Sequence, residues 1–459
     1  MNGTRETKIK LGLVPVKRGP GFTSIENALI PKQHAFEALK NCPAELISID
    51  TVAPNGIAES PDQVPAIVDY LKSQKVDAIF IIHTDFGSEE VIAKIGKEMG
   101  LPVLLWGERD DAPTAEGIRI RDTQCGIFAS AKVLRRFGVP FTYIENCHST
   151  DPAFSEGVEL FLRAASVAKT FNNGLKVLKV GERPASFFSV MASEEEFLRK
   201  FGIEVIPYAM GALIGHVNKL KDNPSDEVSK QVECMKKRMD VKLLGEDKLT
   251  ILAAMVIAIK HEMERIGAAA ASLECWSSMG QIFGFVPCQV IGELTALGYP
   301  VACEGDICGA VTSAMLHAAD FNKSSSFFAD LTIRHPSNDN AELLWHCGPF
   351  PQALMKNGES PFLDDEGRGQ WQLKDGPLTV ARFDSLDGEY SLFVGEGKTT
   401  NGPKSTGTYC WLEVDDWIKW EKKLVEGPYI HHCSVIYGNY AEVLQEACKY
   451  IDGLSADLV

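Results

Sequence analysis

Several patterns that place a chain in a familiar class are missing from this sequence of 459 residues. No apolar run reaches the length of about 18 residues that a membrane-spanning helix needs, so no such helix is expected. The twelve cysteines contain no CxxC spacing. We therefore interpret them as reduced, mostly buried apolar residues and not as a metal or disulfide framework. No GxGxxG fingerprint follows the first predicted strand, which leaves a nucleotide-binding Rossmann site without support.

Basic residues are also fewer than acidic ones. The chain has 46 Lys and Arg and 62 Asp and Glu, which gives a formal net charge of -16. Such a chain repels nucleic acid and anionic membranes, and no local basic patch offsets this, so neither partner is expected. The composition is that of a globular protein, and the length favours two or three domains. The N-terminal segment is typical of a first strand and not of a secretion signal, which predicts a cytoplasmic location.

Apolar runs alternate with amphipathic segments in the first third of the chain. The segments Pro61–Ser73 and Glu89–Met99 have helical periodicity and lie between strand-like runs. Apolar strands with helices between them predict a parallel sheet that is covered on both faces. The strand-like runs are Lys10–Val16, Glu45–Val52, Ala78–His83, Val103–Trp106 and Phe141–Glu145.

Changes in pattern along the chain predict three domains. A long helix over 151–173 closes the first set of strands, and a second set follows at Leu175–Val180, Phe187–Met191 and Glu204–Tyr208. After about residue 345, glycine, proline and alternating strands dominate. We therefore predict an α/β fold with two doubly wound, Rossmann-like domains, residues 1–173 and 174–345, followed by a mainly β domain, residues 346–459.

Two carboxylates occupy unusual contexts. Glu304 follows an apolar strand and precedes a helix rich in small residues, and strand ends of this kind are where α/β proteins place ligands. The alternative is that Asp306 caps the helix while Glu304 lies on a solvated turn. Asp330 interrupts an apolar run, and a buried charge needs a cation, a metal or another partner. The alternative is an edge-strand aspartate that faces water.

Three histidines are candidates for the same chemistry. His346 ends the run Leu-Leu-Trp and is either a ligand or an ordinary core residue. His431 and His432 are adjacent at a predicted strand start, so their side chains are expected to point in opposite directions. One of the two would then bind a metal while the other faces a substrate. Two carboxylates with one or two imidazoles suit Mn²⁺, Mg²⁺, Fe²⁺ or Co²⁺.

The sequence resembles the L-fucose/L-arabinose isomerase superfamily in the order of these motifs. Glu304-Gly-Asp306 follows a strand, Phe-Phe-Ala-Asp330 comes 26 residues after Glu304, and a His-His pair lies near the C-terminus. The predicted division into three domains is also similar, and the likeness covers most of the chain. In the N-terminal part only the pattern is similar.

The resemblance implies a metal-dependent aldose–ketose isomerase that uses Mn²⁺ or a similar ion. It implies that Glu304 and Asp330 are metal ligands and also the acid/base pair of a cis-enediol mechanism. His432 would be a further ligand and His431 a neighbour of the substrate. Asp330 matches the fucose-type branch, whereas His346 lies where the arabinose-type branch has an additional histidine ligand, so the chain combines features of both.

The residues expected to face the substrate lie near predicted strand ends. Arg18, His83 and Trp106 follow or end strands of the first domain, while Trp276 and Gln281 lie upstream of Glu304. For each of them a surface loop with no such role is the alternative. The resemblance implies a homo-oligomer, a trimer or hexamer, in which the first domain contributes to a neighbouring subunit's pocket.

The expected substrate is an unphosphorylated sugar, and two alternatives remain. One is the same reaction on a sulfonated sugar of the sulfoquinovose type, for which Arg18, Arg109, Arg119 or Arg121 would supply a cation. The other is a non-catalytic sugar-binding or sensor protein, because two doubly wound domains also suit ligand capture in a cleft.

Overall fold

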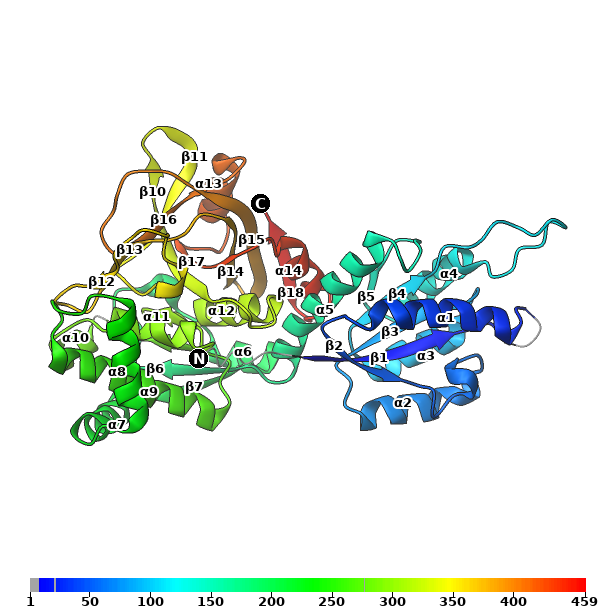
Figure 1. Cartoon of the computed structure of the whole chain (residues 1–459), viewed down its shortest axis with the longest axis horizontal. Coiled ribbons are helices and arrows are strands. Elements are labelled where there is room, and N and C mark those ends of the chain that lie inside the picture. Colours follow the sequence, from blue (N-terminus) through cyan, green and yellow to red (C-terminus); the bar gives the residue numbers. More distant parts are fainter. Residues whose placement is uncertain (1–7, 20–21, 276) are drawn as a thin grey trace. The chain divides into compact units, whose positions relative to one another are not determined.

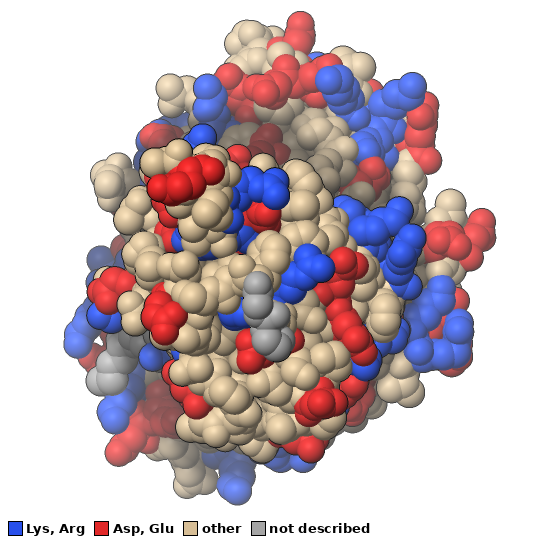
Figure 2. All heavy atoms as spheres, turned by 90° about the vertical axis from the view of Figure 1, so that its right-hand side faces the viewer, with Lys and Arg blue, Asp and Glu red and all other residues tan. Residues whose placement is uncertain are grey.

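The computed structural model describes residues 8–19, 22–275 and 277–459. The chain divides into two compact units, one over Thr7–Lys169 and one that contains Thr170–Val459 (Figure 1). Acidic and basic side chains are interspersed on the molecular face that Figure 2 shows. Among the described residues, no helix is both long and apolar enough to cross a membrane.

The first unit is built on a parallel sheet with the strand order β2-β1-β3-β4-β5. These strands match the five apolar runs expected from the sequence to within a few residues at each end. The strands are β1 (Ile9–Val16), β2 (Ala44–Ser48), β3 (Ala78–His83), β4 (Val103–Gly107) and β5 (Phe141–Tyr143). The helices are α1 (Ile25–Leu39), α2 (Val64–Ser73), α3 (Glu89–Met99), α4 (Thr123–Arg136) and α5 (Pro152–Asn172).

Side chains of this sheet alternate between two packed faces. Ile79 and Ile81 of β3 join one core cluster with apolar residues of α2, α3 and α4. Phe80 points the other way, where it contacts Trp106 and Phe154 of α5. Because both faces are covered, the strands are apolar throughout, as the sequence indicated.

The second unit begins with a parallel sheet of four strands in the order β7-β6-β8-β9. Its strands are β6 (Lys176–Val180), β7 (Glu204–Tyr208), β8 (Ala270–Leu273) and β9 (Val301–Cys303). The helices along this part are α6 (Glu194–Phe201), α7 (Met210–Asp222), α8 (Asp226–Arg238), α9 (Glu246–Ile266), α10 (Ser278–Phe283), α11 (Cys288–Ala296) and α12 (Ile307–Ala319).

A mainly antiparallel sheet of nine strands follows, in the order β12-β13-β16-β11-β10-β17-β14-β15-β18. Strand β16 pairs with β11 and also with β15, which curls the sheet into a barrel-like form. The strands are β10 (Ser326–His335), β11 (Asn338–His346), β12 (Phe362–Leu363), β13 (Gly369–Gln372), β14 (Pro377–Leu386), β15 (Glu389–Thr400), β16 (Thr408–Glu413), β17 (His432–Tyr437) and β18 (Leu454–Leu458). Helices α13 (Trp417–Glu426) and α14 (Ala441–Cys448) accompany them.

Helix α12 joins the two sheets of this unit. It contacts β8 and β9 of the parallel sheet and also β14 and β17 of the nine-stranded sheet (Figure 1). All of its residues are buried, which its sequence ICGAVTSAMLHAA permits because small and apolar residues occur on every side. A helix that is buried all round needs this composition. The N-terminus of α12 therefore lies in the interior, directly after Glu304.

The structure agrees with part of the predicted architecture. Parallel sheets with helices and a mainly antiparallel C-terminal sheet are present, whereas the assignment of two Rossmann-like domains and the three-domain division stay predictions. The run Phe187–Met191 is not a strand, because a 3-10 turn spans Phe188–Val190. Phe188 is largely exposed there, so the apolar run does not mark a sheet position. Strand β10, expected in the second α/β domain, belongs to the nine-stranded sheet.

Candidate active site

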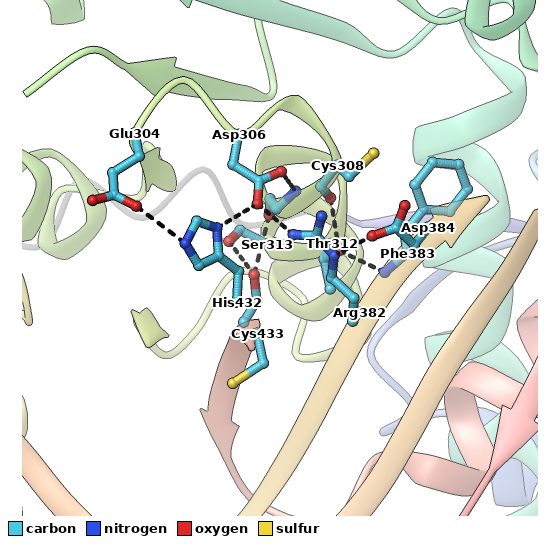
Figure 3. A network of polar contacts seen from close by, with 12 residues as sticks. Glu304, Asp306, Cys308, Thr312, Ser313, Arg382, Phe383, Asp384, His432 and Cys433 are labelled. Atoms are coloured by element: carbon cyan, nitrogen blue, oxygen red, sulfur yellow. Dashed lines mark hydrogen bonds and ion pairs between the residues drawn. The ribbon is translucent and has the colours of Figure 1, made fainter. Parts of the chain in front are cut away.

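Glu304 lies on a sharply bent segment at the end of β9. Its φ is 60°, in the left-handed region that non-glycine residues avoid at a cost of about 1–2 kcal/mol. Gly305 follows with a φ of 68°, and a Cβ there would come within 2.8 Å of the backbone nitrogen of Arg183. Backbone strain of this kind concentrates at functional sites. The Glu304 side chain points toward His432 (Figure 3).

Asp330 and His432 form a cross-strand pair. The antiparallel register of β10 and β17 places the two residues directly opposite each other. Nε2 of His432 lies 3.6 Å from Oδ1 of Asp330 and 3.1 Å from Oε2 of Glu304. The imidazole is fully buried, while the two carboxylates keep 12 % and 16 % of their side-chain surface exposed. Three side chains from two sheets thus converge, and the two carboxylates are partly exposed.

His431 lies beside this cluster. Strand β17 begins at His432, so the alternation of side chains along a strand does not apply to His431. The two imidazole rings are 4.4 Å apart between centroids. Asp330, His431 and His432 each offer a ligand atom, and these atoms lie within 4.8 Å of one another. The expectation that the two histidines point in opposite directions is therefore wrong.

A buried ionic network holds His432 from behind. Figure 3 shows the His432 ring between Glu304 and Asp306. Nδ1 of His432 lies 2.8 Å from Oδ2 of Asp306, and the same oxygen accepts a hydrogen bond of 2.5 Å from Arg382. Asp384 accepts a second hydrogen bond from Arg382, at 2.8 Å. Asp306 also caps α12 by accepting a hydrogen bond from the Gly309 amide, as the sequence suggested.

The charged groups of this network shift the pKa values of Asp306 and His432 toward their ionised forms. Burial alone would raise the pKa of Asp306, but the Arg382 guanidinium and the hydrogen bond from His432 hold this pKa well below its usual range. Burial likewise works to lower the pKa of His432. Hydrogen bonds with Asp306 and Glu304 outweigh burial and raise the pKa of His432 to about 9. These interactions favour the protonated form of the His432 ring.

His346 lies at the end of β11, near the same cluster. It is buried and interacts electrostatically with Asp330 and Glu304. The ring of Phe328 lies 6.3 Å from the His346 ring and 5.2 Å from the His432 ring, measured between centroids. Both imidazoles therefore lie around one phenyl ring.

The donor set fits a divalent cation. Oδ1 of Asp330 is buried and has no hydrogen-bond partner among the described residues, so an additional partner would satisfy it. Carboxylate oxygens together with imidazole nitrogen are ligands that Mn²⁺, Co²⁺ and Fe²⁺ accept. Glu304, Asp330 and His432 are the residues that would hold such an ion, with His431 at the exposed side.

The other predicted substrate residues are not part of this cluster. Arg18, His83 and Trp106 belong to the first unit, where His83 and Trp106 are fully buried. Trp106 packs edge-on against Phe154 at 4.7 Å between ring centroids. Gln281 is exposed on α10, and Trp276 lies outside the described residues. The proposed roles of these residues stay predictions.

Sequence reasoning missed Arg382, which is 1 % exposed and joins two buried carboxylates. The available signal was a cation inside the apolar strand run Leu-Thr-Val-Ala-Arg382-Phe, where an unpaired charge would be unfavourable. A buried arginine predicts an acidic partner, although its identity depends on strand pairing that the sequence does not reveal.

Comparisons with known proteins support the predicted family. A model of the fucose/sulfoquinovose isomerase N-terminal domain matches residues 12–172, and a model of the L-fucose isomerase C-terminal domain matches residues 365–454. A sulfoquinovose isomerase of Priestia aryabhattai is 25 % identical over 445 residues, which are 93 % of this chain and 95 % of that protein. The chain belongs to the L-fucose/L-arabinose isomerase superfamily.

A second curated member of the superfamily matches part of the chain. An L-arabinose isomerase of Escherichia coli O157:H7 is 24 % identical over 278 residues, 56 % of this chain and 54 % of that protein. Among solved structures, a periplasmic solute-binding protein of Actinobacillus succinogenes with bound D-allose is 17 % identical. It covers 58 % of this chain and 78 % of its own at a TM-score of 0.17, too low to bear on fold or function.

These matches confirm the predictions of the superfamily and of an enzyme of the sugar aldose–ketose isomerase class. The non-catalytic alternative is left without support. The two domain models leave residues 173–364 uncovered, and Glu304, Asp330 and His346 lie in this range. The roles of these residues therefore depend on the geometry of the cluster.

Proposed function

We propose that the chain isomerises an aldose to its ketose through a cis-enediol at a divalent cation held by Glu304, Asp330 and His432. The observation that carries the proposal is the position of His432, whose Nε2 lies 3.1 Å from Glu304 and 3.6 Å from Asp330. Mn²⁺ is the proposed ion, with Mg²⁺, Co²⁺ and Fe²⁺ as alternatives. The donor set supports this choice.

The two carboxylates supply the proton transfers. One of them removes the proton from C2 of the aldose and returns it to C1, while the other moves the hydroxyl proton from O2 to O1. The net result is a ketose with no gain or loss of atoms. A bound divalent cation would polarise the carbonyl group and stabilise negative charge on the substrate oxygens. The partial exposure of Glu304 and Asp330 suits groups that contact a substrate.

A sulfonated aldose is the first substrate to test, because curated relatives of nearly equal length are sulfoquinovose isomerases. A sulfonate needs a cation, and we propose Arg18 for this role among the four arginines considered. Its guanidinium packs on the rings of Phe22 and Phe86, at 5.3 and 4.8 Å from their centroids. Arg121, in contrast, is already paired with Asp111 at 2.9 Å. An unsulfonated aldose is the second candidate.

We also propose a cytoplasmic homo-oligomer in which the first unit of one subunit, with Arg18 and His83, completes the pocket of another. This proposal rests on the resemblance to the superfamily. Light scattering of the purified protein tests it directly, since a monomer at micromolar concentration would contradict the shared pocket.

The test is a turnover assay with the Mn²⁺-loaded protein on sulfoquinovose and a panel of unsulfonated aldoses, followed by NMR in D₂O. We expect ketose formation with incorporation of deuterium at the exchanged carbon, and a loss of about 10²–10⁴-fold in Glu304→Gln. Arg18→Gln should lower kcat/KM for the sulfonated sugar and leave that for unsulfonated aldoses nearly unchanged. No turnover of any aldose, or full activity of Glu304→Gln, would overturn the proposal.

A further inference from the structure

The two buried histidines His346 and His432 differ in the partner of their Nδ1 atom. One partner is a hydrogen-bond acceptor and the other is a donor. Each uses Nδ1 for a hydrogen bond. A neutral imidazole carries one proton, so the partner of Nδ1 decides whether Nε2 presents a lone pair or an N–H group. The two rings can therefore be compared atom by atom.

For His432 the partner of Nδ1 is a carboxylate. Oδ2 of Asp306, at 2.8 Å, is held by Arg382 and can only accept a hydrogen bond, so Nδ1 carries the proton of the neutral ring. Nε2 then presents its lone pair toward Glu304 and Asp330. Metal-binding histidines nearly always have this arrangement, in which the second ring nitrogen donates to a carboxylate or carbonyl. Asp306 is accordingly a positioning residue for His432.

For His346 the partner of Nδ1 is a backbone amide. The N–H of Cys347 donates to Nδ1 at 2.9 Å, and an amide nitrogen cannot accept a hydrogen bond. Nδ1 of His346 therefore carries no proton, and the proton of the neutral ring lies on Nε2. This nitrogen is buried and has no hydrogen-bond partner in the described part of the chain. His346 thus presents an N–H group, which cannot bind a metal.

We infer that His346 is not a metal ligand but donates a hydrogen bond from Nε2 to an oxygen of the bound sugar. The inference rests on the proposed function, since it assigns His346 a role toward the same substrate. The His346 and His432 rings both lie near the Phe328 ring, at 6.3 and 5.2 Å between centroids, which places the donor on the same side of β10 as His432. A buried donor without an acceptor is unfavourable, and a substrate oxygen at C1 or C2 would supply the missing acceptor. The role also departs from the ligand that the arabinose-type branch has at this position.

The first test measures metal binding without substrate. Free Mn²⁺ is counted by EPR during titration of the wild type and of the His346→Ala and His432→Ala variants, and folding is checked by circular dichroism. We expect the Kd for Mn²⁺ to stay within about threefold in His346→Ala and to rise at least about 100-fold in His432→Ala. ENDOR on protein with ¹⁵N-labelled histidine should retain the nitrogen coupling in His346→Ala and lose it in His432→Ala.

The second test uses a matched pair of amide substitutions. The Gln amide nitrogen in His346→Gln lies near the position of Nε2 and keeps a donor there, whereas the shorter Asn in His346→Asn does not. We expect kcat/KM to fall about 100-fold in His346→Asn and His346→Ala, and to recover at least tenfold in His346→Gln. The Kd for Mn²⁺ should be the same in all three variants.

Each result separates this inference from the proposed function. If the wild type binds no divalent cation, the proposed metal site and the inference both fail. If the wild type binds Mn²⁺ but His346→Ala loses it as His432→Ala does, His346 is a ligand and only the inference is overturned. Full activity of His346→Ala with intact Mn²⁺ binding would likewise overturn the donor role alone.

Discussion

The region around Asp306 and the outer part of β11 each bury an acidic side chain, in opposite electrostatic surroundings. Asp306 is fully buried against Arg382, which is itself 1 % exposed, and its pKa is lowered. Glu342 is 5 % exposed, but Arg334, which lies opposite it on β10, is 39 % exposed and pairs with Glu421. Burial raises the pKa of Glu342 to about 7. Oε2 of Glu342 has no hydrogen-bond partner among the described residues.

The comparison shows which surroundings keep a buried carboxylate ionised. A cation that water cannot screen stabilises the carboxylate beside it, while an exposed cation of the same type does little. Asp306 therefore stays ionised and can hold His432, whereas the Glu342 carboxylate is held only weakly. An arginine in the neighbouring strand position is not enough to keep a buried carboxylate ionised, because Arg334 lies directly opposite Glu342.

The largest expected effect comes from removing each cation in turn. Arg382→Met leaves Asp306 and Asp384 buried without their partner, which should lower the free energy of unfolding by about 3–5 kcal/mol. The matched change Arg334→Met removes an exposed cation and should lower it by less than about 1 kcal/mol. Urea unfolding measures both. Equal losses in the two variants would remove the distinction between the regions.

The next effect concerns the two acids that share Arg382. Asp306→Asn and Asp384→Asn both remove a buried carboxylate, but only Asp306 contacts His432. We expect the Kd for Mn²⁺ to rise about 10–100-fold in Asp306→Asn and to stay within about threefold in Asp384→Asn. EPR titration at pH 8 measures the difference. A similar loss in both variants would mean that Asp306 acts only through stability.

Glu342→Gln should stabilise the protein in a pH-dependent manner. Because the pKa of Glu342 in the folded state exceeds its value of 4.5 in the unfolded chain, the ionised side chain destabilises the fold above pH 7 and not below pH 4.5. We expect a gain of about 2 kcal/mol at pH 8 and almost none at pH 4.5. The control Glu426→Gln, on the exposed side of α13, should change stability by less than about 0.5 kcal/mol at either pH. A gain that is the same at both pH values would contradict the assignment.

Proton competition couples the affinity for Mn²⁺ to pH. The pKa of His432 is raised to about 9 without a metal, so a proton must leave Nε2 before a cation binds. We expect the affinity for Mn²⁺ to rise about tenfold per pH unit between pH 6 and 8, and to level off above about pH 9. Isothermal titration in two buffers of different ionisation enthalpy should detect release of the proton. An affinity independent of pH would contradict this coupling.

The sequence predicted those features that local pattern determines. Apolar runs identified all five strands of the first sheet. The position of Glu304 after a buried strand marked it as a candidate site residue, and its role stays a prediction. The pairing of Asp330 with His432 was expected only through the superfamily, because these residues are 102 positions apart in the chain. Antiparallel register over such a distance depends on the folded sheet and not on any local pattern.

Features that depend on strand boundaries and partners were not predicted. The predicted orientation of His431 was wrong because β17 begins one residue later, at His432. The predicted strand over Phe187–Met191 was wrong because this apolar run forms a 3-10 turn in which Phe188 is exposed. The assembly of Arg382 with Asp306 and Asp384 requires α12 to pack between two sheets. No single segment of sequence specifies that arrangement.

The most direct test of the metal site is an anomalous difference map from crystals soaked in Mn²⁺. We predict one strong peak per chain, in coordination contact with carboxylate oxygens of Glu304 and Asp330 and with Nε2 of His432, and out of contact with His346. A peak elsewhere, or none at this cluster in crystals of active protein, would contradict the account.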